Sequence, residues 1–372
     1  FDKIDSMTWI QSVKDLCNIL YNLQTLTVPR AVRQLVETEW VHGEENIREL
    51  NAYILQAIRT DLRLHPYLID LLIELEKESD ETNDLKLFLP LFKEQLFQTF
   101  LTNKLYGAFL YKLTERNIIP FSLIQEYADN TNQKSTYNIS DLFYPEFYGA
   151  KSFFYSSDLT LSTNEYKELR KNFFPINMLL QLILDDDIDQ LQLTISRDSV
   201  PIHEPVKLIS FFARNSRDLN PKISLIDFAA ECGSINCFNY LLLNHLDLSY
   251  DSFTSAVRGG NIEIIRKVHD RLLETNGPDY RGKKSFNYSA CLEIAILNHR
   301  NNIVEWLLDQ YESNPFNTLY IACSSSGNIE ATILLFQREI PFPEASKVFP
   351  PMIQNGFYRL VRFFTELSPF VI

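Results

Sequence analysis

The sequence predicts an all-α protein, and three observations carry this prediction. Apolar residues recur at spacings of three and four along most of the chain, which places them on one face of a helix. Only 10 of the 372 residues are glycine, too few for a β-rich fold with many tight turns. In the second half, short turns repeatedly separate pairs of such helical stretches. The chain is therefore expected to consist of packed helices.

Residues 1–130 are predicted to form an N-terminal helical domain. Proline favours the first turn of a helix, because the backbone N–H that it lacks has no partner there. Pro29 and Pro66 therefore mark two helix starts, and His42-Gly43 marks a break. The expected helical stretches are Trp9–Leu26, one from Pro29, one from Glu44, one from Pro66, Leu85–Leu113 with a kink at Pro90, and Pro120–Tyr127.

Residues 131–162 are predicted to be an aromatic-rich junction between two domains. A polar stretch, DNTNQKSTYNIS, precedes a run with seven aromatic residues within 13 positions, from Phe143 to Tyr155. Such a cluster is typical of a protein interface, because tyrosine and phenylalanine are enriched at interface cores. The alternative, which we favour, is a linker that packs its own aromatic side chains.

Residues 163–372 are predicted to be a series of helix pairs joined by tight turns. Ser162 and Glu165 match a capping box that starts a helix. Further along the chain, each residue predicted to form a turn has a small or apolar residue four positions before it. Asp186, upstream of the other turns, fits the same spacing. Such pairs bury their apolar faces only against similar neighbours, which predicts a stack. The turns are Gly233, Gly260, His299, Gly327 and Gly356, at intervals of 27, 39, 28 and 29 residues.

These helix pairs resemble the ankyrin repeat, which has an Ala-Ala pair, a turn glycine and an Ile-Val-x-x-Leu-Leu second helix. The matching residues are Ala229-Ala230, Gly233 and Leu241-Leu242 in one pair, Ala295, Ile303-Val304 and Leu307-Leu308 in another, and Gly260-Asn261 with Ile264-Ile265 in a third. The Thr-Pro-Leu-His element of regular repeats is absent, so the repeats are degenerate. The layout as a whole resembles the degenerate ankyrin proteins of parasitic protists such as trichomonads. This resemblance implies a degenerate ankyrin-repeat solenoid that binds proteins without catalysis.

Charge and composition bound the range of partners and compartments. The net charge of −13 disfavours nucleic acid and anionic lipid as partners. No apolar run is long enough to span a membrane. The segment FDKIDSMTW shows no secretory signal, and a leader before Phe1 is left open. Five cysteines in no regular frame indicate reduced thiols. We expect a cytoplasmic protein, with cytoskeletal association as a further option.

The sequence contains no residue pattern that predicts catalysis, a cofactor or a metal site. The six histidines are isolated, and no Cys-x-x-Cys pair is present. Asp185, Asp187 and Asp189 begin like a calcium loop, but Gln190 and Ser196 occupy the positions that require glycine and glutamate. No phosphate-binding glycine loop or nucleophile frame is found. We therefore expect a protein that is not an enzyme and has no cofactor.

One insertion is the candidate site for a partner protein. The stretch ETNGPDYRGKKSFNY separates the second and third aligned turns and is basic in an acidic chain. Insertions in repeat proteins often project on the binding face. Tyr280, Arg281, Lys283 and Lys284 are thus expected to contact an acidic partner, and a solvated loop is the alternative. The function predicted overall is that of a scaffold or adaptor for one or more proteins, or alternatively a structural component of a cytoskeletal or flagellar assembly.

Overall fold

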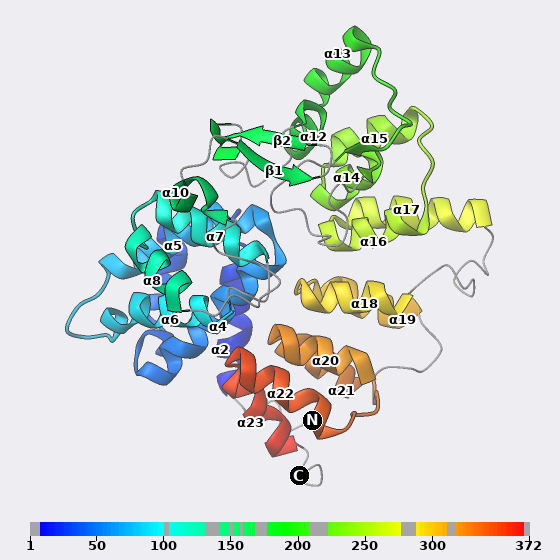
Figure 1. The fold of residues 1–372 in the computed structure, drawn as a ribbon. Helices are drawn as coiled ribbons and strands as arrows, with labels where there is room; N and C mark the ends of the chain where they lie inside the picture. Colours follow the sequence, from blue (N-terminus) through cyan, green and yellow to red (C-terminus); the bar gives the residue numbers. More distant parts are fainter. Residues whose placement is uncertain are drawn as a thin grey trace. The chain divides into compact units, whose positions relative to one another are not determined.

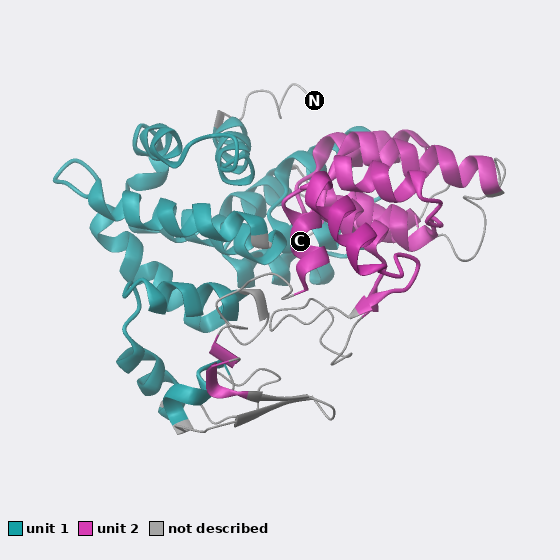
Figure 2. Ribbon diagram, turned by 90° about the horizontal axis from the view of Figure 1, so that it is seen from above, with its two compact units in different colours: residues 1–149, 314–372 teal, residues 150–313 magenta. Residues whose placement is uncertain are grey.

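The all-α class predicted from the sequence is confirmed in a computed structural model of the chain. The structure describes residues 8–99, 104–130, 142–148, 152–156, 159–164, 166–167, 177–207, 222–276, 288–310 and 317–367. Within these ranges most residues are helical (Figure 1). Two short antiparallel β pairs, which the sequence did not predict, are also present. The chain divides into two compact units, which are coloured separately in Figure 2.

Unit 1 combines both ends of the chain, Phe1–Gly149 and Asn314–Ile372. Its centre is helix α4, which carries buried residues on all sides from Ile47 to Thr60 and contacts α2, α5, α6 and α7. Its elements are α2 (Thr8–Tyr21), α3 (Val28–Val36), η1 (Glu39–Val41), α4 (Glu44–Thr60), η2 (Leu62–Leu64), α5 (His65–Lys77), η3 (Leu85–Leu87), α6 (Phe88–Thr99), α7 (Lys104–Glu115), α8 (Phe121–Asn130), α10 (Tyr144–Tyr148), α20 (Asn317–Ser326), α21 (Ile329–Gln337), α22 (Ala345–Asn355) and α23 (Tyr358–Leu367).

Unit 2, Ala150–Ser313, consists mainly of four helical hairpins in series. Its elements are β1 (Ser152–Ser156), β2 (Leu159–Ser162), α12 (Met178–Leu184), α13 (Ile188–Asp198), β3 (Val206–Lys207), β4 (Lys222–Ile223), α14 (Leu225–Cys232), α15 (Ile235–Leu243), α16 (Tyr250–Gly259), α17 (Ile262–Asn276), α18 (Tyr288–Leu297) and α19 (Asn301–Gln310).

The hairpins of unit 2 stack in two layers. The first helices contact one another in sequence, α12 with α14, α14 with α16, and α16 with α18. Among the second helices, α13 contacts α15 and α15 contacts α17. Each hairpin therefore buries its apolar faces against its neighbours, as expected for helix pairs that are too apolar to be stable alone.

Local signals explain where several helices begin. Pro29 lies in the first turn of α3, and Asn177 caps α12 by accepting from the backbone N–H groups of Leu179 and Leu180. Ser249 and Ser252 form a reciprocal capping box at the start of α16. Glu165, the second member of the capping box expected at Ser162, lies outside the described residues, so this expectation stays a prediction.

The expected kink at Pro90 is wrong. Pro90 is the third residue of α6, and the described residues of the predicted stretch Leu85–Leu113 belong to η3, α6 and α7. The first four backbone N–H groups of a helix have no partner inside the helix. A proline in this first turn therefore costs little and does not bend the helix.

The division into units differs from the segments expected from the sequence. Residues 163–372 were assigned to a single repeat segment, whereas the structure places α20 to α23 in unit 1 with the N-terminal helices. Aromatic contacts account for this grouping: the rings of Tyr53 and Phe357 lie 5.0 Å apart between centroids, and those of Trp9 and Phe363 lie 6.3 Å apart. These contacts join residues more than 300 positions apart, which local periodicity cannot predict.

The aromatic-rich junction contributes to both units. Phe143 is buried in unit 1, where its ring lies 5.9 Å from that of Tyr111 and 5.7 Å from that of Phe121. Phe153 belongs to β1 in unit 2, which pairs with β2 in antiparallel register. The sequence missed this β hairpin, because a dense aromatic run was interpreted as linker.

Candidate functional site

The four residues expected to contact a partner, Tyr280, Arg281, Lys283 and Lys284, lie outside the described residues. The structure therefore places none of them. The other residues singled out from the sequence, the turns of the helix pairs, are all described. They lie at the ends of the first helices of the hairpins, in both units.

All six aligned turn residues adopt the left-handed backbone conformation. Their φ angles are 52° at Asp186, 74° at Gly233, 79° at Gly260, 53° at His299, 69° at Gly327 and 80° at Gly356. Glycine takes such angles without steric cost. Aspartate and histidine are among the few other residues that tolerate them, which explains why Asp186 and His299 occur in this frame.

The small or apolar residue four positions before each turn has a specific role. In five of the six turns, the backbone N–H of the residue after the turn donates to the carbonyl of the residue four positions before the turn. In the turn at Gly233, for example, the Ser234 N–H donates to the Ala229 carbonyl at 3.0 Å. The other four bonds join Asp187 to Leu182, Arg300 to Ala295, Asn328 to Cys323 and Phe357 to Met352. Ala229, Ala256, Ala295, Cys323 and Met352 are all completely buried. The turn thus closes over a residue that packs in the hairpin interior.

Polar side chains link successive turns along the stack. The Asp186 carboxylate accepts hydrogen bonds from the backbone N–H groups of Asn236, at 3.2 Å, and Cys237, at 2.9 Å. It thereby caps the N-terminus of α15 in the next hairpin, where negative charge is favoured. The next connection uses a donor: the Asn261 side-chain amide donates to the Gly233 carbonyl at 3.1 Å and so joins the turn at Gly260 to the turn at Gly233.

Half-buried polar residues line the first-helix layer of unit 2. Arg258 on α16 pairs with Glu231 on α14 at 3.3 Å, and both side chains keep about a quarter of their surface exposed. The Ser252 hydroxyl donates a short hydrogen bond to Asp227 of α14. Thr254 is also half-buried. We call Asp227, Glu231, Thr254 and Arg258 the first-helix stripe.

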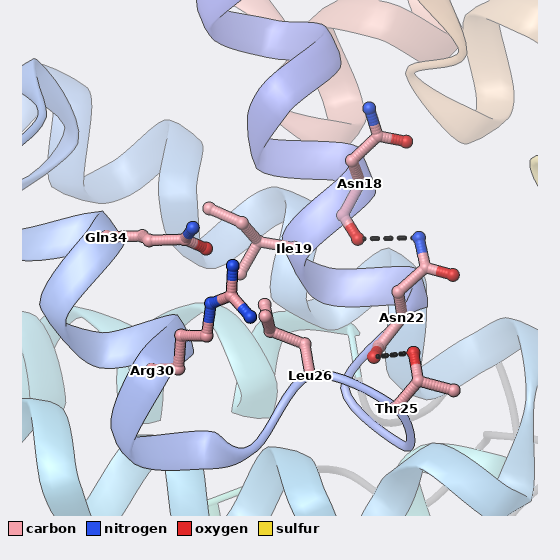
Figure 3. A pocket seen from close by; sticks show the side chains of 7 residues that line it. All are labelled: Asn18, Ile19, Asn22, Thr25, Leu26, Arg30 and Gln34. Carbon is pink, nitrogen blue, oxygen red and sulfur yellow. Dashed lines mark hydrogen bonds between the residues drawn. The ribbon is translucent and has the colours of Figure 1, made fainter.

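A surface pocket of about 370 Å³ lies between α2, α3 and the turn that joins them (Figure 3). Two hydrogen bonds hold the turn: the Asn22 side-chain amide donates to the Asn18 carbonyl at 2.8 Å, and the Thr25 hydroxyl donates to the Asn22 carbonyl at 3.0 Å. No pattern in the sequence predicts this pocket. Its lining consists of Asn18, Ile19, Asn22, Thr25, Leu26, Arg30 and Gln34.

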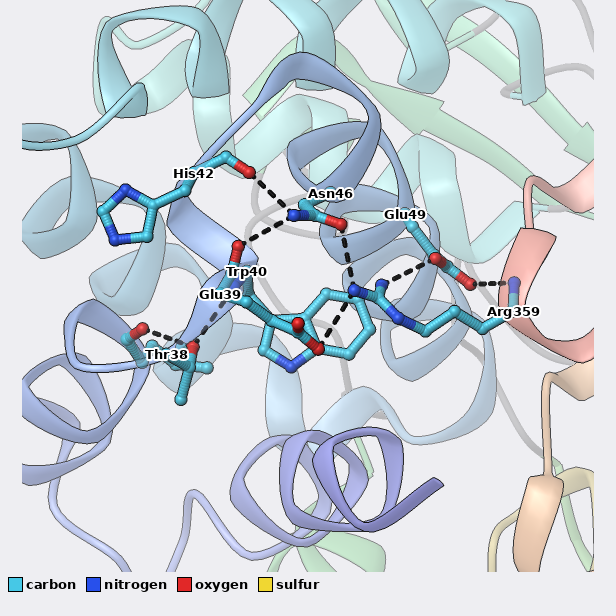
Figure 4. A network of polar contacts seen from close by, with 8 residues as sticks. Thr38, Glu39, Trp40, His42, Asn46, Glu49 and Arg359 are labelled. Atoms are coloured by element: carbon cyan, nitrogen blue, oxygen red, sulfur yellow. Dashed lines mark hydrogen bonds and ion pairs between the residues drawn. The ribbon is translucent and has the colours of Figure 1, made fainter. Parts of the chain in front are cut away.

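A second feature that sequence analysis missed is a polar network around Arg359 (Figure 4). The Arg359 backbone N–H and Nη1 donate to the two carboxylate oxygens of Glu49, each at 2.8 Å. Nη2 donates to Asn46 Oδ1 at 2.9 Å and lies 3.1 Å from a carboxylate oxygen of Glu39. The guanidinium carbon stands 4.0 Å from the Trp40 ring centroid, a cation–π distance.

The network holds α23 against α4 and η1. Glu49 is 2% exposed, and burial raises the pKa of its carboxyl group although Arg359 acts in the opposite direction. Arg359 binds both oxygens of this carboxylate, so the Glu49 side chain contributes to the packing of unit 1. Glu49 and Arg359 therefore form an ion pair with a structural role, unlike an exposed catalytic acid.

The cysteines are free thiols, and the buried ones resist ionisation. Cys237, Cys291 and Cys323 are buried, and desolvation raises the pKa of their thiols to about 12, 11 and 12. At Cys237 the nearby Asp186 carboxylate contributes to this raised pKa after desolvation. Only the thiolate is a strong nucleophile, so these three groups are unreactive near neutral pH.

We expect iodoacetamide at about pH 8 to leave Cys237, Cys291 and Cys323 unmodified in the folded protein. The same residues should react rapidly in concentrated urea, where the desolvation is lost. Peptide mass spectrometry after timed quenching measures each site separately, and the urea sample is the control. Rapid alkylation of any of the three in the folded protein would contradict the assigned burial.

The described residues also bear on metal ions and on membranes. No group of three or more histidine, cysteine, aspartate or glutamate side chains within the described ranges is arranged to hold a metal ion. Among the described helices, none is both long enough and apolar enough to cross a membrane. No protein-family model matches the chain, and no curated protein matches it.

Proposed function

We propose that this protein is a non-catalytic scaffold that recognises another protein through a solenoid of degenerate ankyrin-like helical hairpins. The recognition surface in this proposal is the first-helix stripe of unit 2. Stacked helical hairpins expose a continuous face formed by side chains from successive repeats, and repeat proteins commonly bind partners with such a face.

The observation that carries the proposal is the regular stacking of the hairpins in unit 2. First helices contact first helices, second helices contact second helices, and side chains connect one turn to the next. The antiparallel pair of β3 and β4 between the hairpins α12–α13 and α14–α15 is a further similarity to ankyrin repeats, whose hairpins are joined by β-turns. The left-handed turn glycines Gly233 and Gly260 support the same assignment.

Four buried groups with side chains of the types that enzymes use have other roles or are inert. Glu49 is bound by Arg359, and the thiols of Cys237, Cys291 and Cys323 stay protonated near neutral pH. Both observations favour a binding role for this part of the chain.

A charge exchange within the first-helix stripe tests the proposal. The double variant Glu231→Lys and Arg258→Glu keeps the ion pair between α14 and α16 but reverses its direction on the surface. The matched control is Arg271→Glu with Glu274→Arg on α17, which exchanges an exposed pair on a second helix. Full-length wild-type and variant chains are used to capture partners from cells of the source organism, with quantitative mass spectrometry and thermal unfolding measured in parallel.

We expect the stripe variant to lose at least about tenfold of a partner that the wild-type chain enriches, because a reversed charge pair opposes the charges that complement it. The control should retain that partner, and both variants should unfold at the wild-type temperature. The proposal fails if no protein is enriched by the wild-type chain, or if the stripe variant and the control capture the same amount.

A further inference from the structure

We propose that the pocket between α2 and α3 binds a carboxylate-bearing peptide segment of a partner protein. In this complex Arg30 pairs with the carboxylate, while Asn18 and Gln34 hydrogen-bond the peptide backbone. The pocket belongs to unit 1 and lies outside the first-helix stripe. This inference therefore stands on its own observations and does not depend on the function proposed for unit 2.

Arg30 is the charged group that selects the ligand. Its side chain is exposed and makes no ion pair or side-chain hydrogen bond with any residue in the described part of the chain. By contrast Arg48, Arg258 and Arg362 each pair with a carboxylate of the protein. A planar guanidinium group matches a carboxylate with two parallel hydrogen bonds. Arg30 therefore has the free donors that an external carboxylate requires.

The surroundings of Arg30 strengthen such a pair. In Figure 3 its guanidinium group points into the pocket, toward Ile19 and Leu26. Ile19 is 9% exposed and Leu26 is half-buried, so both present apolar surface to a bound peptide. Apolar walls exclude water on binding, and charge pairs are stronger where the effective dielectric constant is lower.

The amide side chains suit the backbone of a peptide. Asn18 on α2 and Gln34 on α3 both line the pocket, and neither amide group bonds another described residue. In Figure 3 the Gln34 amide lies near the Arg30 guanidinium group, and Asn18 lies beyond Ile19. Each amide offers both a donor and an acceptor, the complement of one peptide unit. Asn22 supplies a further acceptor, because among the residues that the structure describes its side-chain amide forms a hydrogen bond only through its N–H group.

The charge of the pocket favours a carboxylate over a phosphate group. Arg30 is the one cation among the pocket residues, and all the others are neutral. Proteins generally recognise phosphorylated segments with clusters of arginines. A single arginine among amides instead balances the single charge of a carboxylate.

The test is a selection from a random octapeptide library displayed on phage, with the full-length chain as bait. Enriched peptides are synthesised with a fluorescent label, and their affinities are measured by fluorescence anisotropy. Arg30→Ala is the test variant. Arg33→Ala is the control, because Arg33 lies one turn further along α3, outside the pocket, with its Nε donating to the Pro29 carbonyl at 3.3 Å. Circular dichroism verifies that both variants fold.

Enriched peptides should carry aspartate, glutamate or a required free C-terminus, and amidation of the C-terminus separates these two sources of the carboxylate. Arg30→Ala should weaken binding at least about tenfold, since hydrogen bonds to charged groups are the strong ones, while Arg33→Ala should change it less than about twofold. The proposal is overturned if no peptide is enriched, if enriched peptides lack a carboxylate, or if Arg30→Ala binds them as well as the wild type. It is equally overturned if only phosphorylated versions of the peptides bind.

Discussion

Replacing Arg359 with methionine should destabilise unit 1 by about 3–5 kcal/mol, the usual cost of leaving one member of a buried ion pair without its partner. Glu49 would then keep its buried position while losing the guanidinium group at 2.8 Å. The contact of Arg359 with the Trp40 ring would be lost as well. Urea denaturation followed by circular dichroism measures the loss, and the fluorescence of Trp9 and Trp40 reports on unit 1.

The matched control adds Glu49→Gln to Arg359→Met. Glutamine fits the site of Glu49, still accepts from the backbone N–H of residue 359, and leaves no unpaired charge. The double variant should therefore be more stable than Arg359→Met alone, with a coupling energy of about 0.5–3 kcal/mol. If both variants lose the same free energy of unfolding, the uncompensated carboxylate is not the cause.

The pH dependence of the same variants has a definite sign. Burial raises the pKa of Glu49 above its ordinary value of 4.5, so the folded state binds a proton there more readily than the unfolded state. The stability that this proton supplies is present below pH 4.5 and is lost as the pH rises through the folded pKa. Arg359 lowers this pKa, so the folded-state pKa of Glu49 should be higher in Arg359→Met. The decrease in the free energy of unfolding with rising pH should therefore extend to higher pH in this variant. Denaturation curves at about pH 5 and about pH 8 measure the difference.

Replacing Gly259 with alanine should destabilise unit 2, although alanine is the better helix former by roughly 0.5–1 kcal/mol. Gly259 is the last residue of α16, and a Cβ atom there would meet the carbonyl oxygens of Ala230 and Glu231 on α14, the second of them at 2.9 Å. These oxygens belong to the backbone of the neighbouring helix, so the two hairpins would have to separate. Overpacking of this kind typically costs about 1–3 kcal/mol.

The control for Gly259→Ala is Arg258→Ala at the preceding position. This change removes the ion pair with Glu231 between the same two helices but leaves their spacing unchanged. A partly exposed ion pair contributes about 0–1 kcal/mol, so the control should lose much less stability. Urea denaturation followed by circular dichroism measures the free energy of unfolding of both variants. A stabilised Gly259→Ala variant would show that α14 and α16 do not approach each other closely.

Features fixed by neighbouring residues were predictable from the sequence. Gly233 was identified as a turn, and Ala229 as a packed position, because both act within a single hairpin. The network of Glu49 and Arg359 was not predictable from the sequence. These residues are 310 positions apart, and each alone resembles an ordinary surface charge on a helix. The stretch FYRLVRFFT holds two arginines, Arg359 and Arg362, and nothing in the sequence indicates that Arg359 pairs with a buried carboxylate while Arg362 pairs with Glu366 at the surface. The strand β1 was missed because its aromatic residues were assigned to a linker.

Sequence patterns also could not predict the pocket between α2 and α3. Asn18 and Arg30 are polar residues on the exposed sides of two ordinary helices, and nothing in their spacing indicates a shared site. The turn that brings them together depends on hydrogen bonds of Asn22 and Thr25 to backbone carbonyl groups. Such a surface is visible only after the helices have been packed.

The distance in sequence between Glu49 and Arg359 also affects how the chain matures on the ribosome. At a synthesis rate of about 5–20 residues per second, Glu49 is made about 15–60 s before the arginine 310 positions later that neutralises it. The N-terminal helices must therefore remain incomplete while the intervening segment is translated. The hairpins of unit 2 find their neighbours soon after each emerges, so the middle of this protein is expected to reach its native state before the part that was made first.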